Sequence, residues 1–285
     1  MFRNMKIRTK LTLVFLGIGI GIIVIVNYIG YSTARRLMEQ ESYNKLIAMR
    51  EIKKGQIQDL FEEDGRDIRI LAQSTDVQGL FEKLVQYHLD TKVGPNDPYD
   101  VSTAQYQKIY AEYGDVLAQY IKIHGYRDIY MICSAHGHVM YSVEQKSDLG
   151  SNLNVGPYKD THLAKLWRTV VNTRQAAIED FQPYAPGNDE PVSFIGSPII
   201  KKTGEIIGVL ALQVSVDEIN KIMRPREGLG QTGEIYLVGS NKLMRSDSIL
   251  DPTNHSVRAS FHDPEKGKVD TEAAREALAG KTDVR

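Results

Sequence analysis

The chain has 285 residues, of which 42% are hydrophobic and 25% charged, and its formal net charge is −1. These values are ordinary for a globular protein and exclude the strong basic excess that nucleic-acid-binding proteins carry. The single cysteine, Cys133, excludes both a disulfide framework within the chain and a four-cysteine metal site.

The segment from Leu11 to Gly30 contains no charged residue. About 20 helical residues at roughly 1.5 Å each span about 30 Å, which is the thickness of the hydrocarbon core of a membrane. Cations without any acid precede this segment: Arg3, Lys6, Arg8 and Lys10. We therefore expect residues 1–10 to be cytoplasmic and residues 11–30 to form a transmembrane helix in the inner membrane of a bacterium.

Two other interpretations of the apolar segment are open. A cleaved signal peptide would have a shorter apolar core and a small-x-small cleavage site, which Tyr28-Ile29-Gly30-Tyr31 does not provide. A buried core helix rarely lacks charge around its whole circumference. Gly17 and Gly21 form a small-xxx-small pair that allows close helix approach, so we expect a homodimer.

Residues 31–124 have the pattern of a long helix followed by a helical linker. No proline occurs between Gly30 and Gly94, and apolar residues recur at helical spacing throughout. We expect this helix to be interrupted near Ser74-Thr75-Asp76. The sequence Gly94-Pro95-Asn96-Asp97-Pro98 predicts a loop, and a second amphipathic helix follows with its apolar face between Tyr106 and Ile121.

The pattern changes to strands in residues 125–224. Strands at Ile129–Cys133 and Val139–Val143 flank the short turn Ser134-Ala135-His136-Gly137, and a helix is expected from about Thr161 to Thr173. Three more strands are predicted near Ala177–Phe181, Val192–Ile200 and Glu205–Val216. Two strands, a helix and three antiparallel strands are the order of a PAS-like α+β unit.

The beginning of this unit recurs further along the chain. Residues 234–238 (EIYLV) are similar in sequence to residues 128–132 (DIYMI), and residues 243–246 are similar to residues 139–142. The repeat predicts a second, tandem PAS-like unit that starts in residues 225–285 and is cut short there. Because a sheet with open edges and an uncovered face is unstable, we expect the natural protein to continue past residue 285.

This organisation resembles the double Cache (dCache) sensor domains of methyl-accepting chemotaxis receptors and sensor kinases. Residues 228–238 (GLGQTGEIYLV) and 243–247 (LMRSD) are similar to the start of the membrane-proximal unit in chemotaxis receptors. The resemblance implies a chemoreceptor whose membrane-distal unit binds a small molecule and passes the signal across the membrane as a helix shift. It also fits the input domain of a sensor histidine kinase or nucleotide cyclase. A membrane-anchored binding protein without an output domain is a third interpretation.

The resemblance also implies where the ligand binds. Family members that bind amino acids carry an Arg-x-Trp-Tyr motif on the helix after the first hairpin and an aspartate on the last strand. Here the motif matches residues 165–168 (KLWR), and Gln213 occupies the position of the aspartate. A neutral amide does not balance a buried ammonium, so a free amino acid or amine is disfavoured and an anionic or neutral ligand is expected.

Lys165 and Arg168 would hold such a ligand by charge-assisted hydrogen bonds, within aromatic walls. Alternatively, Trp167 is a core residue and Arg168 is solvated. The expected ligand-binding residues are Tyr130, Tyr141, Lys165, Trp167, Arg168, Tyr184, Phe194 and Gln213.

No catalytic, metal or cofactor site is expected in the chain. His136 and His138 offer two imidazoles, but their neighbours in the sequence supply no third ligand. Neither the Gly-x-Ser-x-Gly nor the His-Glu-x-x-His motif occurs. An enzymatic output, as in a kinase or cyclase, would lie outside this sequence.

Overall fold

The computed structural model describes residues 6–281, so Arg3, one of the four cations before the apolar segment, lies outside the described part. The described residues fall into two compact units, one up to Ile52 and one that begins at Lys53. The first unit consists of the N-terminal part of helix α1, whose bounds are Ile7–Ala72.

The predicted membrane span lies within α1. The most apolar 18-residue window of this helix has a mean hydropathy of 2.4, and none of that window is buried. Within residues 6–281, α1 is the one helix that is long and apolar enough to cross a membrane by length and composition. This agrees with the span predicted between Leu11 and Gly30.

The second unit begins with the end of α1 and two further helices, α2 (Thr75–Thr91) and α3 (Ala104–His124). The interruption predicted near Ser74 is confirmed, because its hydroxyl accepts a hydrogen bond from the amide of Val77 and so begins α2. Gly125 ends α3 with a φ of 77°, in the left-handed region that favours glycine.

An antiparallel five-stranded sheet follows, with the order β2-β1-β5-β4-β3. A helix, α4 (His162–Thr173), connects β2 to β3, and a 3-10 turn, Ala185–Gly187, connects β3 to β4. All five strands were predicted, and their bounds are β1 Asp128–Cys133, β2 Val139–Ser142, β3 Ala177–Tyr184, β4 Glu190–Ile200 and β5 Ile206–Val214.

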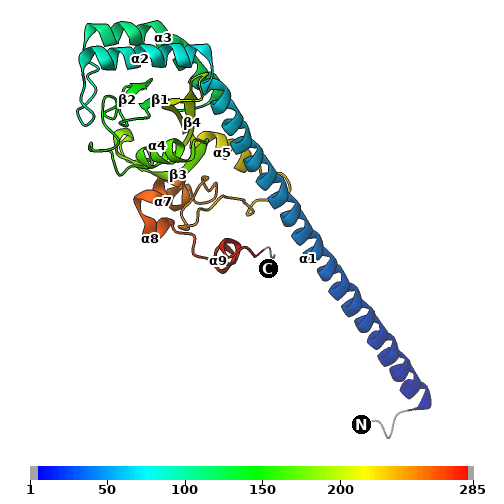
Figure 1. Ribbon diagram of the computed structural model, residues 1–285. Helices are drawn as coiled ribbons and strands as arrows, with labels where there is room; N and C mark the ends of the chain where they lie inside the picture. The colour runs from blue at the N-terminus through cyan, green and yellow to red at the C-terminus, as the bar shows by residue number, and fades with distance from the viewer. Residues whose placement is uncertain (1–5, 282–285) are drawn as a thin grey trace. The chain divides into compact units, whose positions relative to one another are not determined.

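The sheet separates two hydrophobic cores. Figure 1 shows α2 and α3 on one side of the strands and α4 on the other. Alternate residues of β1 accordingly enter different cores, Ile129 and Met131 on the side of α2 and α3, and Tyr130 and Ile132 on the side of α4. Gly196 in β4 allows the close approach of α4, because a Cβ there would lie 2.9 Å from Cδ2 of Leu166.

Five short helices follow the sheet within the described residues, namely α5 Val216–Met223, α6 Pro252–His255, α7 Val257–His262, α8 Pro264–Gly267 and α9 Glu272–Leu278. The segment from residue 234 to residue 246, which repeats the sequence of the first hairpin, forms a tight turn with an isolated bridge between Val238 and Met244. Of residues 225–281, none forms a strand of a second sheet. The second PAS-like unit therefore stays a prediction.

This C-terminal segment is attached to the sheet by an ion pair. Arg245, whose side chain is 6% exposed, donates from Nε and Nη2 to the two carboxylate oxygens of Asp180 on β3, at 2.7 and 2.8 Å. A bidentate pair of this kind fixes orientation as well as distance. A second link, between Arg258 and Glu190, joins α7 to β4 at 3.0 Å.

Candidate ligand-binding site

The structure separates one of the predicted ligand-binding residues from the others. Tyr130, Trp167, Tyr184 and Phe194 belong to the core between the sheet and α4. Tyr141 is also fully buried, but it lies in the opposite core, where it stacks on Tyr110 of α3 with ring centroids 5.1 Å apart. Tyr141 therefore does not share a site with the other predicted residues.

Phe194 lies at the centre of a group of buried rings on the α4 side of the sheet. Its ring centroid is 4.8 Å from that of His162, 5.1 Å from that of Tyr184 and 5.8 Å from that of Tyr130. We call these four residues, together with Asp148, the Phe194 cluster. Each of the five is at most 3% exposed.

Two buried polar atoms of the Phe194 cluster have no hydrogen-bond partner among residues 6–281. Asp148 accepts a hydrogen bond from the Tyr184 hydroxyl on Oδ2 at 2.5 Å, whereas its Oδ1 is unpartnered. Nε2 of His162 is unpartnered as well. Buried polar groups in native proteins are nearly always hydrogen-bonded, so these two atoms are places where ligand groups can bind.

Burial also shifts the ionisation of these side chains. It raises the pKa of the Asp148 carboxyl, and it lowers the pKa of His162 to about 4. The imidazole of His162 is therefore neutral at pH 7. Burial, reinforced by the carboxylates of Asp128 and Asp148, raises the pKa of Tyr130 well above its usual value, so this phenol stays protonated.

Asp128 lies next to the cluster but already has its partners. Its carboxylate accepts hydrogen bonds from the amides of Ile129, Val143 and Glu144 and from the hydroxyl of Ser142. Burial nevertheless raises the pKa of Asp128 to about 6. These bonds hold the end of β2 against the start of β1, which is a structural role.

Gln213 connects the Phe194 cluster to a cavity of about 550 Å³, which we call the Gln213 cavity. Its side chain is nearly buried, and its Oε1 accepts a hydrogen bond of 3.4 Å from the hydroxyl of Tyr130. Polar and charged residues line the cavity, among them Arg127, Lys146, Asn188, Glu190, Gln213, Ser215 and Arg258.

Lys146 is the cation of this cavity that is available to a ligand. Arg127 is paired with Asp217, and Arg258 is paired with Glu190. In the part of the chain that the structure describes, Lys146 is a half-buried residue whose ammonium has no ion-pair partner.

Trp167 packs against the turn between β1 and β2. Its indole Nε1 donates a hydrogen bond of 2.9 Å to the carbonyl oxygen of Cys133, and a Cβ placed on Gly137 would lie 3.0 Å from its ring. The indole N–H and one part of the ring are thus engaged by the protein. Contact between Trp167 and a ligand stays a prediction.

The two cations predicted to hold the ligand also have protein partners. Lys165 forms an ion pair of 2.8 Å with Glu179, and its side chain is 64% exposed. Arg168 donates to the backbone carbonyls of Lys159 at 3.0 Å and Leu153 at 3.4 Å. Both residues bind the protein's own groups, so their contact with a ligand also stays a prediction.

Three residues of the candidate site were not predicted from the sequence, namely Lys146, Asp148 and His162. A histidine at the start of an apolar helix face was the available signal for His162, because α4 buries Leu163, Ala164 and Leu166 directly after it. Lys146 and Asp148 lie in the irregular segment after β2, where no periodicity distinguishes a buried residue from an exposed one.

The solved structures that resemble this chain include sensor domains. No protein-family model matches the chain, and no curated protein sequence matches it significantly. The sensor domain of the histidine kinase DctB from V. cholerae is 15% identical, with a TM-score of 0.51 over 82% of this chain and 79% of that one. The chain has the fold of this sensor domain.

Structures of chemoreceptor domains are also similar. The ligand-binding domain of the Pseudomonas fluorescens chemoreceptor CtaA, in complex with L-serine, is 14% identical, with a TM-score of 0.48 over 82% of this chain and 83% of that one. The ligand-binding domain of the Campylobacter jejuni chemoreceptor Tlp3, in complex with 4-methylisoleucine, is 14% identical, with a TM-score of 0.43 over 73% and 69%.

Proposed function

We propose that this chain is the sensing part of a transmembrane chemoreceptor and that it binds a small molecule on the extracytoplasmic side of a bacterial inner membrane. The observation that carries the proposal is the Phe194 cluster, a buried group with unpartnered polar atoms next to a cavity, on the fold of a known sensor domain. The apolar part of α1 would anchor the protein, with its N-terminus in the cytoplasm.

The proposed ligand is anionic or neutral and carries a hydrogen-bond donor. Lys146 would bind an anionic group at the Gln213 cavity, and Oδ1 of Asp148 would accept the donor. The amide of Gln213 can serve as donor or acceptor between them. Lys165 is exposed enough to exchange Glu179 for a ligand, whereas Arg168 would have to release two carbonyls.

The proposed signal is a shift of α1 relative to the sheet. Two polar contacts hold α1 against elements next to the sheet: Lys53 donates to the carbonyl of Ile222 on α5 at 2.5 Å, and the hydroxyl of Tyr126, just before β1, donates to Asp64 at 2.6 Å. A ligand moves this equilibrium only if it binds one position of the helix more tightly than the other. Dimerisation through Gly17 and Gly21 would bring two such helices together.

An alternative output is a sensor histidine kinase or a nucleotide cyclase, in which the same module would be the input domain. The similarity to the DctB sensor domain favours keeping this alternative. The reading frame beyond residue 285 separates the two. A second span that leads to a long heptad-patterned helical hairpin supports the chemoreceptor, and a dimerisation helix with an ATP-binding domain supports the kinase.

A thermal-shift screen of the full chain in detergent micelles tests ligand binding. A compound at about 100 times its Kd should stabilise the folded state by roughly 2.7 kcal/mol and raise Tm by roughly 5–10 °C. The screen should include carboxylates, amides, polyols and free amino acids. If no class of compound raises Tm, the proposal fails. If amino acids alone do so, and Gln213→Ala still responds, the proposed ligand class is wrong.

Two variants locate the site once a ligand is found. Asp148→Asn and Tyr184→Phe should each reduce the ligand-induced Tm shift by more than half, because they change the unpartnered carboxylate or the hydroxyl that orients it. Tyr141→Phe is the matched control, because it removes a buried hydroxyl from the opposite core. An equal loss of response in all three variants would place the ligand outside the Phe194 cluster.

A further inference from the structure

Three histidines that are distant in the sequence converge beside a second cavity. His88 lies on α2, His136 lies in the turn after β1, and His138 directly precedes β2. One ring nitrogen of each residue lies within 4.8 Å of those of the other two. The ring centroids are 5.2 Å apart for His88 and His138, 5.7 Å for His136 and His138, and 5.9 Å for His88 and His136.

The three imidazoles have buried nitrogens without partners. Among residues 6–281, the Nδ1 atoms of His88, His136 and His138 are all buried and make no hydrogen bond. Packing explains the ring contacts, such as the stacking of His88 on Tyr99 at 6.0 Å. It does not explain three unpartnered nitrogens on neighbouring rings, because an unmet hydrogen bond of a buried polar group costs about 1–3 kcal/mol.

His138 has the geometry of a preoriented metal ligand. Its ring is fully buried, and its Nε2 lies 2.8 Å from the backbone carbonyl oxygen of Asp97. A carbonyl oxygen can only accept, so Nε2 carries the proton and Nδ1 carries the free lone pair. Metal-bound histidines usually donate their second nitrogen to a carbonyl or carboxylate in this way, which fixes both the tautomer and the ring orientation.

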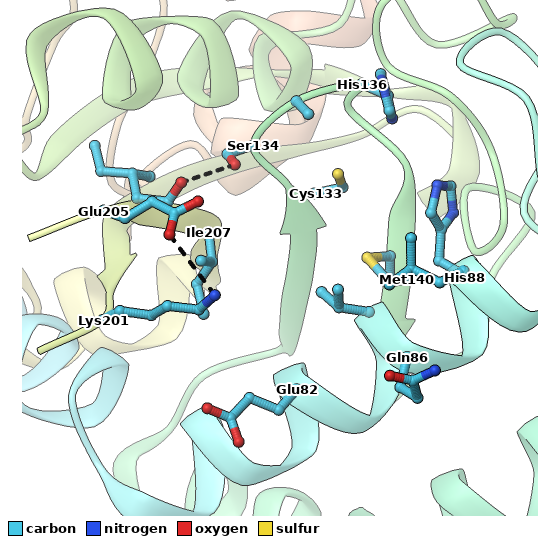
Figure 2. Close-up of a pocket in the computed structure, with 14 residues that line it drawn as sticks. Glu82, Gln86, His88, Cys133, Ser134, His136, Met140, Lys201, Glu205 and Ile207 are labelled. Carbon is cyan, nitrogen blue, oxygen red and sulfur yellow. Dashed lines mark hydrogen bonds and ion pairs between the residues drawn. The ribbon is translucent and has the colours of Figure 1, made fainter. Parts of the chain in front are cut away.

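The cavity offers a further coordination position. Its volume is about 490 Å³, and both His88 and His136 line it, together with Glu82, Cys133 and Met140. Figure 2 shows the two histidines at one end of this cavity and the ion pair of Lys201 and Glu205 at the other. Three histidines with an open position towards a cavity form an incomplete tetrahedral set, which water or an oxygen atom of a small molecule can complete.

We propose that His88, His136 and His138 bind a divalent transition-metal ion, with Zn²⁺ as the preferred ion. Imidazole nitrogen suits zinc, copper and nickel, whereas magnesium and calcium require oxygen ligands. Tetrahedral zinc at about 2.0–2.1 Å from each nitrogen places the nitrogens about 3.4 Å apart, so the nitrogens, which lie within 4.8 Å of one another, must approach by up to about 1.4 Å. His88 and His136 are half-buried and line the cavity, whereas His138 is fully buried, so we expect the approach to come from His88 and His136.

The ion would join α2 to the β1–β2 hairpin. These two elements are distant in the sequence and come together only in the folded chain. This site shares no residue with the Gln213 cavity. Metal binding would therefore persist even if the proposed small-molecule site proved wrong.

Metal content tests the proposal on the full chain in detergent, purified through a tag that contains no histidine. The protein is stripped with EDTA, dialysed against buffer with micromolar Zn²⁺ and analysed by inductively coupled plasma mass spectrometry. We expect about one zinc per chain, and a Kd at least about tenfold weaker for His88→Gln and for His136→Gln. His262→Gln is the matched control, because His262 is exposed on α7.

A wild-type chain that holds no more zinc than the double variant His88→Gln/His136→Gln overturns the proposal. Equal loss of zinc in His262→Gln overturns it as well, since the ion would then bind elsewhere. A second measurement uses the unaltered protein: Zn²⁺ should protect His88 and His136 at least fivefold from diethyl pyrocarbonate, as read by mass spectrometry, and should leave His262 reactive. Absence of this protection contradicts the site even if the variants fail to fold.

Discussion

Replacing Gly208 by alanine should lower the free energy of unfolding by roughly 2–3 kcal/mol, through overpacking between β5 and α2. A Cβ at this position would overlap the ring of Phe81, lying 2.5 Å from its Cε2, and would be 3.0 Å from the carbonyl oxygen of Ile132. Both obstacles are buried, and the carbonyl belongs to the neighbouring strand β1. The strand and the helix can therefore make room only by moving apart.

Thermal and urea-induced unfolding of the full chain, followed by circular dichroism, measure this effect. Gly55→Ala is the matched control, because a Cβ there meets nothing within 4 Å and alanine is favoured by about 1 kcal/mol in a helix interior. The same substitution should thus have opposite signs at the two positions. Adding Phe81→Leu to Gly208→Ala should restore part of the loss, since the two side chains share one space. Unchanged stability of Gly208→Ala would show that α2 does not pack here.

The sequence predicts the elements of this fold well because their signals are local. The uncharged run from Leu11 to Gly30 predicts the apolar helix, and the change from helical to alternating spacing predicts the five strands. The capping hydroxyl of Ser74 marks the interruption between α1 and α2. Each of these signals lies within a few residues of the feature that it predicts.

The candidate site was predicted less completely because it depends on register and on distant contacts. Tyr141 pairs with Met131 across β1 and β2, which places it on the side of α3, and a shift of one residue would have placed it beside Tyr130. No local pattern fixes this register. Likewise, Asp148 meets Tyr184 from 36 residues away, and only the folded sheet brings them together.

The proposed metal ligands show the same limit more clearly. His136 and His138 are visible as a pair in the sequence, but the third histidine of the group, His88, lies on a helix that is separated from them by a long loop and another helix. The sequence neighbours of His136 and His138 supply no third imidazole, and the one that lies close in space comes from another element of the fold. A constellation assembled from separate elements becomes visible only when the topology is known.

His162 should make the protein sensitive to mild acid. Its folded pKa is about 4, because burial beside Tyr184 and Phe194 disfavours the charged ring, although the carbonyl of Val192 and the charge of Asp180 act in the opposite direction. The unfolded value is about 6.5. Between these values the unfolded chain binds a proton that the folded chain does not, so stability is complete above pH 6.5 and is lost as the pH falls towards 4. From pH 7 to pH 5 this contribution falls by roughly 2 kcal/mol.

The variant His162→Gln isolates this contribution, because other buried groups titrate in the same range. Burial raises the folded pKa of Asp128 to about 6, so the folded chain takes up this proton first and gains stability as the pH falls from about 6 to 4. Asp148 acts in the same direction. In the wild type the pH dependence of the unfolding free energy is the sum of the destabilising effect of His162 and the opposite effect of the two carboxyl groups. The carboxyl groups contribute equally to wild type and variant, so the difference between the two proteins reports His162 alone.

The loss of unfolding free energy between pH 7 and pH 5 should be roughly 2 kcal/mol smaller in His162→Gln, and unchanged in His262→Gln, whose ring is exposed. Parallel pH profiles of wild type and His162→Gln would mean that this ring is solvated and that the Phe194 cluster is open to water.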